Sequence, residues 1–461
     1  MKKLIGTKEF YKAALIIALP IMIQNGLTSF VNLLDNLMVG TLGTESMTGV
    51  SIANQLLFVY QLTVFGGVSG AGIFTAQYYG KGDDEGIRYT MRFKLIVTVL
   101  LATVAAILFL TAGDRLIDLF LYADNVNNVD LCRSEALRYL KIMILTTFPF
   151  ALTQVYGDTL RSCGHTTVPM YAGTAAILVN LVFNYILIFG KLGLPALGVV
   201  GAAIATLMAR ITECGIMIGW THLHAKKYTF ITGAWHSLHI PTPLTKRIAV
   251  KGMPLLINEV FWSMGMTFMA QCYSTRGLSA VAAYQICQTV WQLFTIVAFA
   301  LGSSVGIIVG QKLGAGKLEQ AREDAAKMIA FSATVAAICG IIMALLSPIF
   351  PQLYNTTEDV RILASKMLII MSIVLPMLAF TNACYFTLRC GGKTLVTMLF
   401  DSVFVWAVCI PVGWCLSRFT TLPMFPLFCL CQIPEIVKCF LGFFMVKSGT
   451  WVQDLTNIPQ S

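Results

Sequence analysis

The chain has 461 residues and a formal net charge of +10, with 57% hydrophobic residues, 12% charged residues and a mean hydropathy of +0.76. Soluble domains carry about 25% charged residues, so this composition excludes a soluble protein. Apolar runs of about 20 residues, the length at which a helix crosses a bilayer, recur along the whole chain. The sequence therefore predicts an all-α integral membrane protein with many spans.

The basic residues, the cysteines and the N-terminus exclude further classes. Lys and Arg lie mostly in short connections, which retention of loops on the cytoplasmic side explains better than nucleic-acid binding. The 13 cysteines lie mostly inside apolar runs and form no C-x-x-C pair, so they indicate neither a zinc site nor a disulfide framework. The basic N-terminus leads into an apolar run of about 27 residues with no cleavage pattern, which predicts an uncleaved first helix.

Apolar periodicity and turn-forming residues predict twelve transmembrane helices. Their expected ranges are 13–39, 49–78, 93–112, 139–160, 168–189, 197–220, 248–273, 281–310, 328–347, 365–387, 395–415 and 425–446. With the N-terminus inside, 21 of the 32 Lys and Arg residues fall in inner segments and 9 in outer loops. This bias predicts a multi-pass protein of the cytoplasmic membrane with both termini in the cytoplasm.

The two halves of the chain repeat. A shift of 234 residues aligns several residues without a gap, among them Gly72 with Gly306, Gln77 with Gln311 and Gly80 with Gly314. A shift of 228 residues aligns the segment 159–161 with 387–389. Six helices per half is an even number, which predicts two pseudo-symmetric lobes of the same orientation with a binding cavity between or within them. We expect an N-lobe at 1–225, a cytoplasmic linker at 226–247 and a C-lobe at 248–461.

The chain offers no ATP-binding loop. The segment 314–318 superficially resembles one, but Gln311 stands where the first glycine belongs and Leu318 where Ser or Thr belongs. No soluble segment is large enough for a nucleotidase domain. Any pumping must therefore draw on an ion gradient.

Three stretches resemble the MATE (multidrug and toxic compound extrusion) family. These are the first helix ending LLDNLMVGTLG, the stretch TLRSCGHTTVPM, and the most specific one, NLVFNYILIFGKLGLPALGVVGAAIAT. The resemblance covers essentially all twelve spans. It implies two six-helix lobes, alternating access, and export of organic cations or other amphiphiles in exchange for Na⁺ or H⁺.

Six acidic residues lie inside or near the ends of the predicted spans. Three have a basic residue three positions away on the same helix, which favours a structural role: Asp158 with Arg161, Glu213 with Arg210, and Glu435 with Lys438. The other three have no basic residue within four positions and need a partner from another helix, a bound cation or a proton: Asp35, Glu259 and Asp401. A carboxylate in an apolar span costs several kcal/mol, so these three are functional candidates.

Asp35, near the end of the first helix, is the strongest candidate for ion coupling. Asn180 and Asn184 share one face of the fifth predicted helix, and with Asp35 and the Thr206 hydroxyl they offer the oxygen ligands that Na⁺ prefers. By resemblance these four are the ion-site positions of the N-lobe, although some relatives carry an aspartate where Asn184 stands. The alternatives are an aspartate wetted by the outer vestibule and an ordinary interhelical asparagine bond.

Glu259, Asp401 and Gln285 are the candidates for substrate binding in the C-lobe. Glu259 follows Pro254 by about one turn and resembles a glutamate proposed for cation binding in the family, and Asp401 resembles an aspartate of a related subgroup. A role in helix packing is the alternative for each. Many relatives have an acidic residue where this chain has Lys393, so we expect altered contacts at an inner gate.

These features predict an antiporter, not an enzyme, that exports organic cations in exchange for H⁺ or Na⁺. It would need no cofactor, act on cationic amphiphiles within the lipid membrane, bind no nucleic acid and work as a monomer. Na⁺, if used, would bind at Asp35, Asn180, Asn184 and Thr206. The alternatives are a lipid-linked sugar flippase, which the near absence of basic residues in mid-span disfavours, and a membrane enzyme, for which the histidines near residue 230 lack metal-binding spacing.

Overall fold

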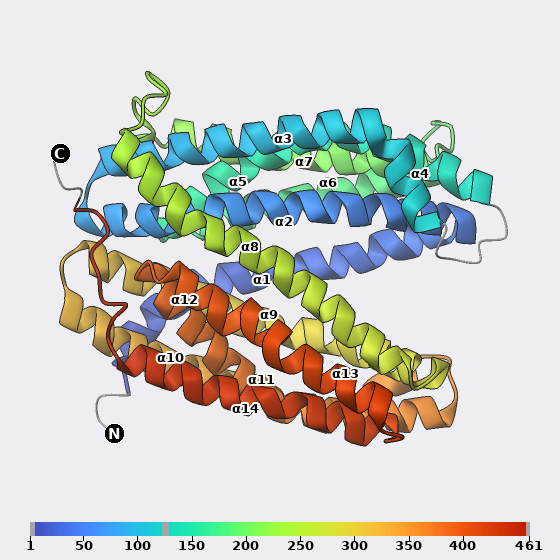
Figure 1. The fold of residues 1–461 in the computed structure, drawn as a ribbon. Coiled ribbons are helices and arrows are strands. Elements are labelled where there is room, and N and C mark those ends of the chain that lie inside the picture. Colours follow the sequence, from blue (N-terminus) through green and yellow to red (C-terminus); the bar gives the residue numbers. More distant parts are fainter. Residues whose placement is uncertain (1–4, 122–128, 458–461) are drawn as a thin grey trace. The chain divides into compact units, whose positions relative to one another are not determined.

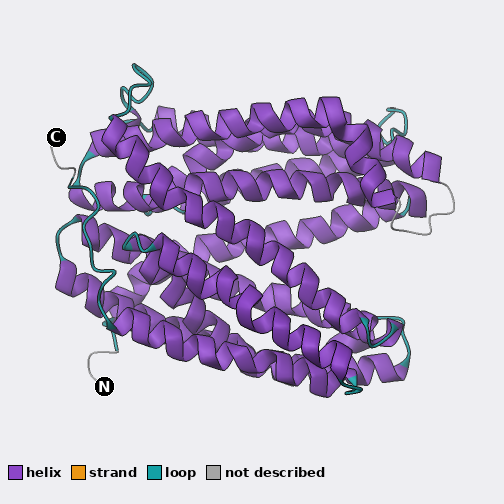
Figure 2. Ribbon diagram, in the orientation of Figure 1, coloured by secondary structure: helices purple, strands orange, loops and turns teal. Residues whose placement is uncertain are grey.

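The computed structural model describes residues 5–121 and 129–457, and these residues form helices and connecting loops with no strand (Figures 1 and 2). Lys2 and Lys3, which contribute to the predicted orientation, lie outside the described residues, as do the outermost residues of both predicted lobes. The all-helical prediction is confirmed.

The first half of the chain forms six predicted spans from seven α-helices. These are α1 (Lys8–Gly40), α2 (Thr44–Lys81), α3 (Asp84–Leu121), α4 (Val129–Met143), α5 (Thr147–Ser162), α6 (Thr167–Phe189) and α7 (Val199–Leu223). A single 3₁₀ turn, Ile144–Thr146, joins α4 to α5, so that together they make one span.

The second half also forms six spans. Its helices are α8 (Thr242–Ser274), α9 (Leu278–Gly314), α10 (Leu318–Leu346), α11 (Glu358–Cys390), α12 (Thr394–Met398), α13 (Ile410–Phe419) and α14 (Met424–Lys447). The π-helical turns Leu399–Val403 and Val405–Cys409 connect α12 to α13, and the four pieces make one span.

Twelve spans were predicted, and each corresponds to one helix or to a run of joined helical pieces. Of the described helices, eleven are apolar and long enough to cross a membrane by composition alone. The twelfth, α8, has 33 residues, but it also carries Lys251, Asn258 and Glu259. Several helices begin up to about ten residues before the predicted start, because charged turns such as the one at Asp84 and Glu85 extend the helix beyond its apolar stretch.

The chain divides into two compact units. The N-terminal unit comprises Ile23–Thr75 and Asp84–Lys246, and the C-terminal unit comprises Met1–Met22, Ala76–Asp83 and Arg247–Ser461. Both α1 and α2 are divided between the units. The predicted lobe boundaries, which assign each helix whole to one lobe, therefore stay a prediction.

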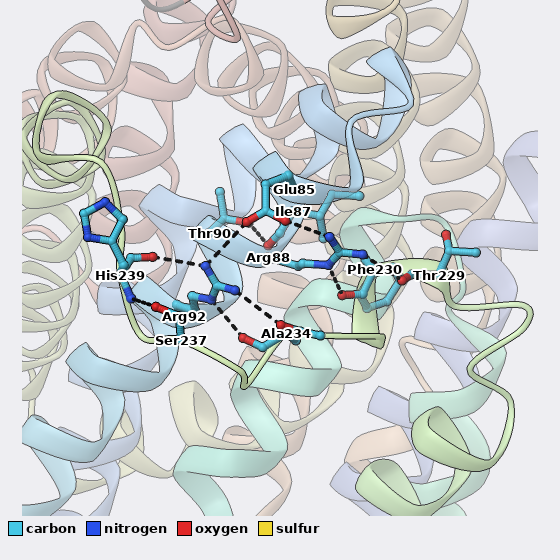
Figure 3. Close-up of polar contacts among 11 residues, drawn as sticks. Glu85, Ile87, Arg88, Thr90, Arg92, Thr229, Phe230, Ala234, Ser237 and His239 are labelled. Carbon is cyan, nitrogen blue, oxygen red and sulfur yellow. Dashed lines mark hydrogen bonds and ion pairs between the residues drawn. The ribbon is translucent and has the colours of Figure 1, made fainter.

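In the N-terminal unit, the connection between α7 and α8 folds against the start of α3. Arg88 Nε donates to the carbonyl of Phe230 at 3.2 Å, and Arg92 Nε donates to the carbonyl of Ala234 at 2.8 Å (Figure 3). The Arg92 side chain is buried, and its Nη1 also donates to the carbonyl of His239 at 3.1 Å. These bonds satisfy carbonyl groups that the loop itself leaves unpaired. The connection is therefore a packed part of the unit.

A ring pair, in which Tyr228 is buried and His165 half-buried, ties the same connection to the turn between α5 and α6. The rings of His165 and Tyr228 meet edge to face, with centroids 5.0 Å apart. Burial, together with the nearby charge of Lys227, lowers the pKa of His165 below its ordinary value. The imidazole is therefore neutral at pH 7.

In the C-terminal unit, α11 packs along α9, α10 and α14 around apolar clusters. The segment after α14 crosses the end of this bundle and buries Trp451 completely. Gln77, near the end of α2, is also fully buried: its Nε2 donates to the Cys390 carbonyl at 2.9 Å, and its Oε1 accepts from the Leu455 amide at 2.7 Å. The chain after α14 is thus fixed by both halves of the repeat.

Two glycines allow the ends of α2 and α9 to cross in close contact. A Cβ atom on Gly80 would overlap the backbone carbonyl of Gln311, and a Cβ atom on Gly314 would overlap the carbonyl of Gln77. The sequence repeat aligns Gly80 with Gly314 and Gln77 with Gln311. The two repeats therefore meet through equivalent residues, in reciprocal contacts that only glycine permits.

We expect Gly80→Ala and Gly314→Ala each to destabilise the protein by about 1–3 kcal/mol, because the added methyl groups meet rigid backbone. The thermal unfolding midpoint of the purified protein in detergent measures this effect. Gly215→Ala is the matched control, because a Cβ atom there meets nothing within 4 Å. Equal midpoints for all three variants would contradict the close crossing.

Candidate functional site

The N-terminal unit contains a polar cavity of about 480 Å³. Side chains of α1, α2, α4, α5, α6 and α7 line it, and many of them are polar or charged: Thr28, Asn32, Asp35, Asn36, Ser51, Asn54, Gln55, Gln61, Tyr139, Asn184, Thr206 and Arg210. Asp35 is the carboxylate of this set. Interhelical polar side chains are expensive to bury in a membrane protein, so such a concentration of them is typical of a path for ions or substrate.

Three of the four predicted ion-coupling residues line this cavity, and the fourth, Asn180, is hydrogen-bonded to two of them. Asn184 Nδ2 donates to Asp35 Oδ1 at 2.7 Å and to Asn180 Oδ1 at 3.2 Å. Asn180 Nδ2 donates to Thr206 Oγ1 at 3.3 Å, and the Thr206 hydroxyl donates to the Ala202 carbonyl at 3.0 Å. Residues of α1, α6 and α7 thus form one hydrogen-bonded chain that ends at the carboxylate.

The Asn180 amide also faces the Asp35 carboxylate. In the amide orientation that satisfies both of its polar atoms, the Asn180 nitrogen lies 3.0 Å from both carboxylate oxygens of Asp35 and donates to them. Both asparagines of α6 therefore contact the carboxylate of α1.

One oxygen at this site has no hydrogen bond. Within the described part of the chain, the buried Oδ1 of Asn184 finds no donor. A buried acceptor left unsatisfied costs about 1–3 kcal/mol. The amide oxygens of Asn180 and Asn184, the Thr206 hydroxyl and the Asp35 carboxylate together supply the hard oxygen ligands that an alkali cation prefers. The residues present fit Na⁺ as well as a proton.

A separate buried ion pair lies in the same unit. Lys94 is fully buried, and its Nζ lies 2.7 Å from Asp158 Oδ2. The same ammonium donates to the hydroxyls of Thr75 at 2.9 Å and Thr159 at 3.1 Å. The prediction that Arg161 neutralises Asp158 is therefore wrong. Its ion-pair partner is Lys94 of the neighbouring helix α3, because the packing of α3 against α5 brings the ammonium to the carboxylate. The predicted pair of Arg210 and Glu213 is confirmed at 3.0 Å.

The C-terminal unit contains a second cavity, of about 500 Å³, with a different lining. Aromatic rings and thioethers dominate, with amides between them: Trp262, Met266, Met269, Tyr273, Tyr284, Gln285, Gln288, Trp291, Gln292, Phe299, Met371, Phe428 and Gln432. Glu435 and Lys438 of α14 are the charged residues of the lining. A volume of this size suits a drug-sized ligand.

Asp401 lies outside the lining of this cavity and forms an ion pair with Lys438, which is part of the lining. Lys438 Nζ lies 2.7 Å from Asp401 Oδ1, and Asn258 Nδ2 donates to Asp401 Oδ2 at 3.1 Å. The Asn258 oxygen in turn accepts from the Ser402 hydroxyl at 2.6 Å. The π-helical turn Leu399–Val403 carries Asp401, and such turns often occur at functional sites.

The structure separates the three predicted substrate-binding residues. Gln285 lines the cavity. Asp401 does not reach the lining, although its partner Lys438 does. Glu259 also lies outside the lining, where its carboxylate interacts electrostatically with Arg389 and Asp401. Lys438 pairs directly with Asp401, while Glu435 interacts with the Lys438 charge from a greater distance and accepts a hydrogen bond from the Thr381 hydroxyl at 2.9 Å. The predicted pairing of Lys438 with Glu435 is therefore only a secondary interaction.

The sequence profile of the MatE family matches residues 20–186 and 254–415, which together are most of the chain. The chain belongs to the MatE family. The two matched segments begin at Pro20 and Pro254, which the 234-residue repeat also aligns. Its membership confirms the resemblance found in the sequence.

Curated relatives of the chain match over most of their length. One is the probable multidrug resistance protein NorM of Thermotoga maritima, 25% identical over 453 residues that cover 96% of this chain and 93% of that protein. Another is the probable multidrug resistance protein YoeA of Bacillus subtilis, 24% identical over 87% of this chain and 86% of that protein. The multidrug resistance protein MdtK of Yersinia pseudotuberculosis is 25% identical over 78% of this chain and 77% of that protein.

Solved structures share the fold. A crystal structure of MATE in complex with MaL6 superimposes with a TM-score of 0.85 at 20% identity and covers 97% of both chains. An outward-facing multidrug resistance MATE family transporter of the MOP superfamily gives 0.83 at 19% identity, again over 97% of both chains. The chain is therefore a multi-pass membrane protein with the twelve-helix, two-lobe fold of the MATE transporters.

Sequence reasoning did not predict that Arg210 lines the polar cavity, or that Glu435 and Lys438 line the aromatic one. Each had been assigned to a pair on its own helix. One signal could have identified the partner of Lys438: a basic residue in mid-span is costly, and Asp401 was a mid-span acid that lacked a partner. Matching these two charges across helices predicts the observed pair.

We expect Asp401→Asn to destabilise the protein by about 3–5 kcal/mol, because it leaves the Lys438 ammonium buried without its partner. The double variant Asp401→Asn/Lys438→Met should recover most of the loss, since it removes both charges. Thermal unfolding of purified protein measures both effects. Glu358→Gln is the control, because the pair of Glu358 with Arg361 is exposed and should contribute less than about 1 kcal/mol. A double variant no more stable than Asp401→Asn would argue against the ion pair.

Proposed function

We propose that this protein is an ion-coupled antiporter that exports organic cations across the cytoplasmic membrane, with both termini in the cytoplasm. The observation that carries the proposal is the hydrogen-bonded chain of Asp35, Asn184, Asn180 and Thr206 at a polar cavity of the N-terminal unit. The relatives NorM and MdtK are named as multidrug resistance proteins, which supports organic cations as the cargo. The excess of basic residues in the inner segments supports the orientation.

Protonation of Asp35 would change the hydrogen bonds that join α1 to α6. An ionised Asp35 accepts hydrogen bonds from the amides of Asn184 and Asn180. Protonation would turn one of its acceptor oxygens into a donor and so weaken the bonds that join the carboxylate to α6. A proton can therefore favour one conformation of the unit, and antiport requires only that proton and cargo favour different conformations.

Sodium could act at the same place by coordination. The unpaired Oδ1 of Asn184 and the Asp35 carboxylate would be two ligands, with Asn180 and Thr206 oxygens as others. Asparagine in place of an acidic residue at position 184 leaves the site with the single negative charge of Asp35. A site of low charge binds a cation weakly, as a coupling ion that must be released requires.

The aromatic cavity of the C-terminal unit suits the cargo. Its rings can face a cation, its methionines adapt to ligands of different shape, and its glutamine amides offer neutral hydrogen-bond partners. The predicted contribution of Gln285 is consistent with this lining. Glu259 and Asp401 lie outside the lining, so neither would contact the cargo there.

We expect Asp35→Asn to reduce gradient-driven export of a fluorescent lipophilic cation from proteoliposomes to the level of protein-free liposomes. The substitution preserves the shape of the side chain but removes both its charge and its proton exchange. Export would be measured under a pH gradient alone and under a Na⁺ gradient alone. Export driven by the pH gradient would make Asp35 the proton site. Export driven by the Na⁺ gradient would favour coordination of Na⁺ by Asp35, Asn180 and Asn184.

Asp114→Asn is the matched control, since it makes the same chemical change at an exposed position of α3 and should leave export unchanged. Circular dichroism and the elution volume of Asp35→Asn should match those of the native protein. Full export by Asp35→Asn would contradict the ion-coupling role. No export by the native protein under either gradient would favour the alternative, a lipid-linked sugar flippase.

A further inference from the structure

Glu435 is the acidic side chain that lines the aromatic cavity, and the ammonium next to it on α14 is bound elsewhere. Lys438 lies 2.7 Å from Asp401, a distance at which the two charges neutralise each other. Among the described residues, no basic side chain lies within ion-pair distance of Glu435. One of its oxygens accepts a hydrogen bond from the Thr381 hydroxyl at 2.9 Å, which fixes the orientation of the carboxylate.

The ionisable groups at this cavity leave one negative charge uncompensated. Asp401 and Glu435 are the acids, and Lys438 is the base, so that the three together carry a net charge of −1. The remaining polar lining is neutral, with amides from four glutamines and hydroxyls from tyrosine and threonine. A ligand with a single positive charge would bring the cavity to neutrality.

Aromatic rings in the same cavity lining complete the site. Trp262, Trp291 and Phe299 line the cavity with Tyr273 and Phe428. Ring faces attract a cation by about 0.5–2 kcal/mol, and more strongly as water is excluded. The same rings supply apolar area for the body of an amphiphile.

We propose that Glu435 binds the positive charge of a monovalent amphiphilic cation in this cavity, and that the pairing of Lys438 with Asp401 sets the number of charges that the cavity accepts. The inference rests on the proposed function and names the side chain and the ligand class of its substrate site. Asp401 serves this site as a positioning residue that engages the Lys438 ammonium.

A set of charge variants tests the inference by equilibrium binding to the purified protein. The probes are tetraphenylphosphonium, which has one positive charge, dequalinium, which has two, and triphenylphosphine oxide, which is neutral. Glu435→Gln brings the net charge to zero, and Thr381 can still donate to the amide oxygen. We expect the Kd of tetraphenylphosphonium to rise about tenfold or more and that of triphenylphosphine oxide to stay unchanged.

Two double variants separate charge from structure. Asp401→Asn/Lys438→Gln removes the ion pair but keeps the net charge at −1, so tetraphenylphosphonium should bind within about threefold of the native affinity. Gln432→Glu/Glu435→Gln moves the carboxylate from position 435 to position 432, which also lines the cavity. This variant should restore most of the binding that Glu435→Gln loses. Lys438→Gln brings the net charge to −2 and should shift the preference from tetraphenylphosphonium towards dequalinium.

Unchanged binding of tetraphenylphosphonium to Glu435→Gln would overturn the inference and leave the proposed function standing. Loss of binding in Asp401→Asn/Lys438→Gln, with Glu435 intact, would also overturn it, because Asp401 would then be the binding group. Failure of the proposed function gives a different result, in which the native protein neither binds nor exports any of the monovalent cations.

Discussion

The cost of holding a charge in an apolar surrounding governs the interior of this protein. Lys94 and Lys438 are both buried basic residues in spans, and each lies 2.7 Å from a carboxylate of another helix. Neither ammonium could be buried alone, since the penalty for an unpaired ion is several kcal/mol. Once these pairs form, Asp35 and Glu435 remain as cavity carboxylates without a basic partner at ion-pair distance in the described part of the chain. Pairing elsewhere therefore identifies the carboxylates that are free to meet a cation or a proton.

The two halves use one backbone plan with different chemistry. Gly72 lies close to the carboxylate of Asp158, and its repeat equivalent Gly306 lies close to the ring of Phe386, the equivalent of Asp158 under the second shift. Under the 234-residue shift, Lys94 corresponds to Met328, which is buried in an apolar cluster. The two ion-pair residues of one half thus correspond to apolar residues in the other. The small residues that set the helix spacing are shared, and the side chains that fill the space have diverged.

The sequence predicted the spans and the repeat because both depend on local or regular patterns. Apolar length alone decides whether a helix crosses a membrane, and a constant shift aligned Gly80 with Gly314 before the structure showed their reciprocal contacts. The polar chain from Asp35 to Thr206 could also be anticipated, since Asn180 and Asn184 share a helix face. The partner of Asp158 could not be anticipated, because a contact between helices depends on how each helix is rotated about its axis, and the partner of Asp401 follows only from matching it with the mid-span charge of Lys438. At Asp401, the π-helical turns change that rotation locally.

The segment after α14 has a practical consequence for work on this protein. Trp451 is fully buried against the bundle, a Cβ on Gly391 would overlap its backbone carbonyl, and the Leu455 amide bonds Gln77 of the first repeat. A purification tag or fluorescent partner fused in place of residues after Lys447 would delete these contacts and expose apolar surface at the end of the bundle. Fusions should leave residues 448–457 intact.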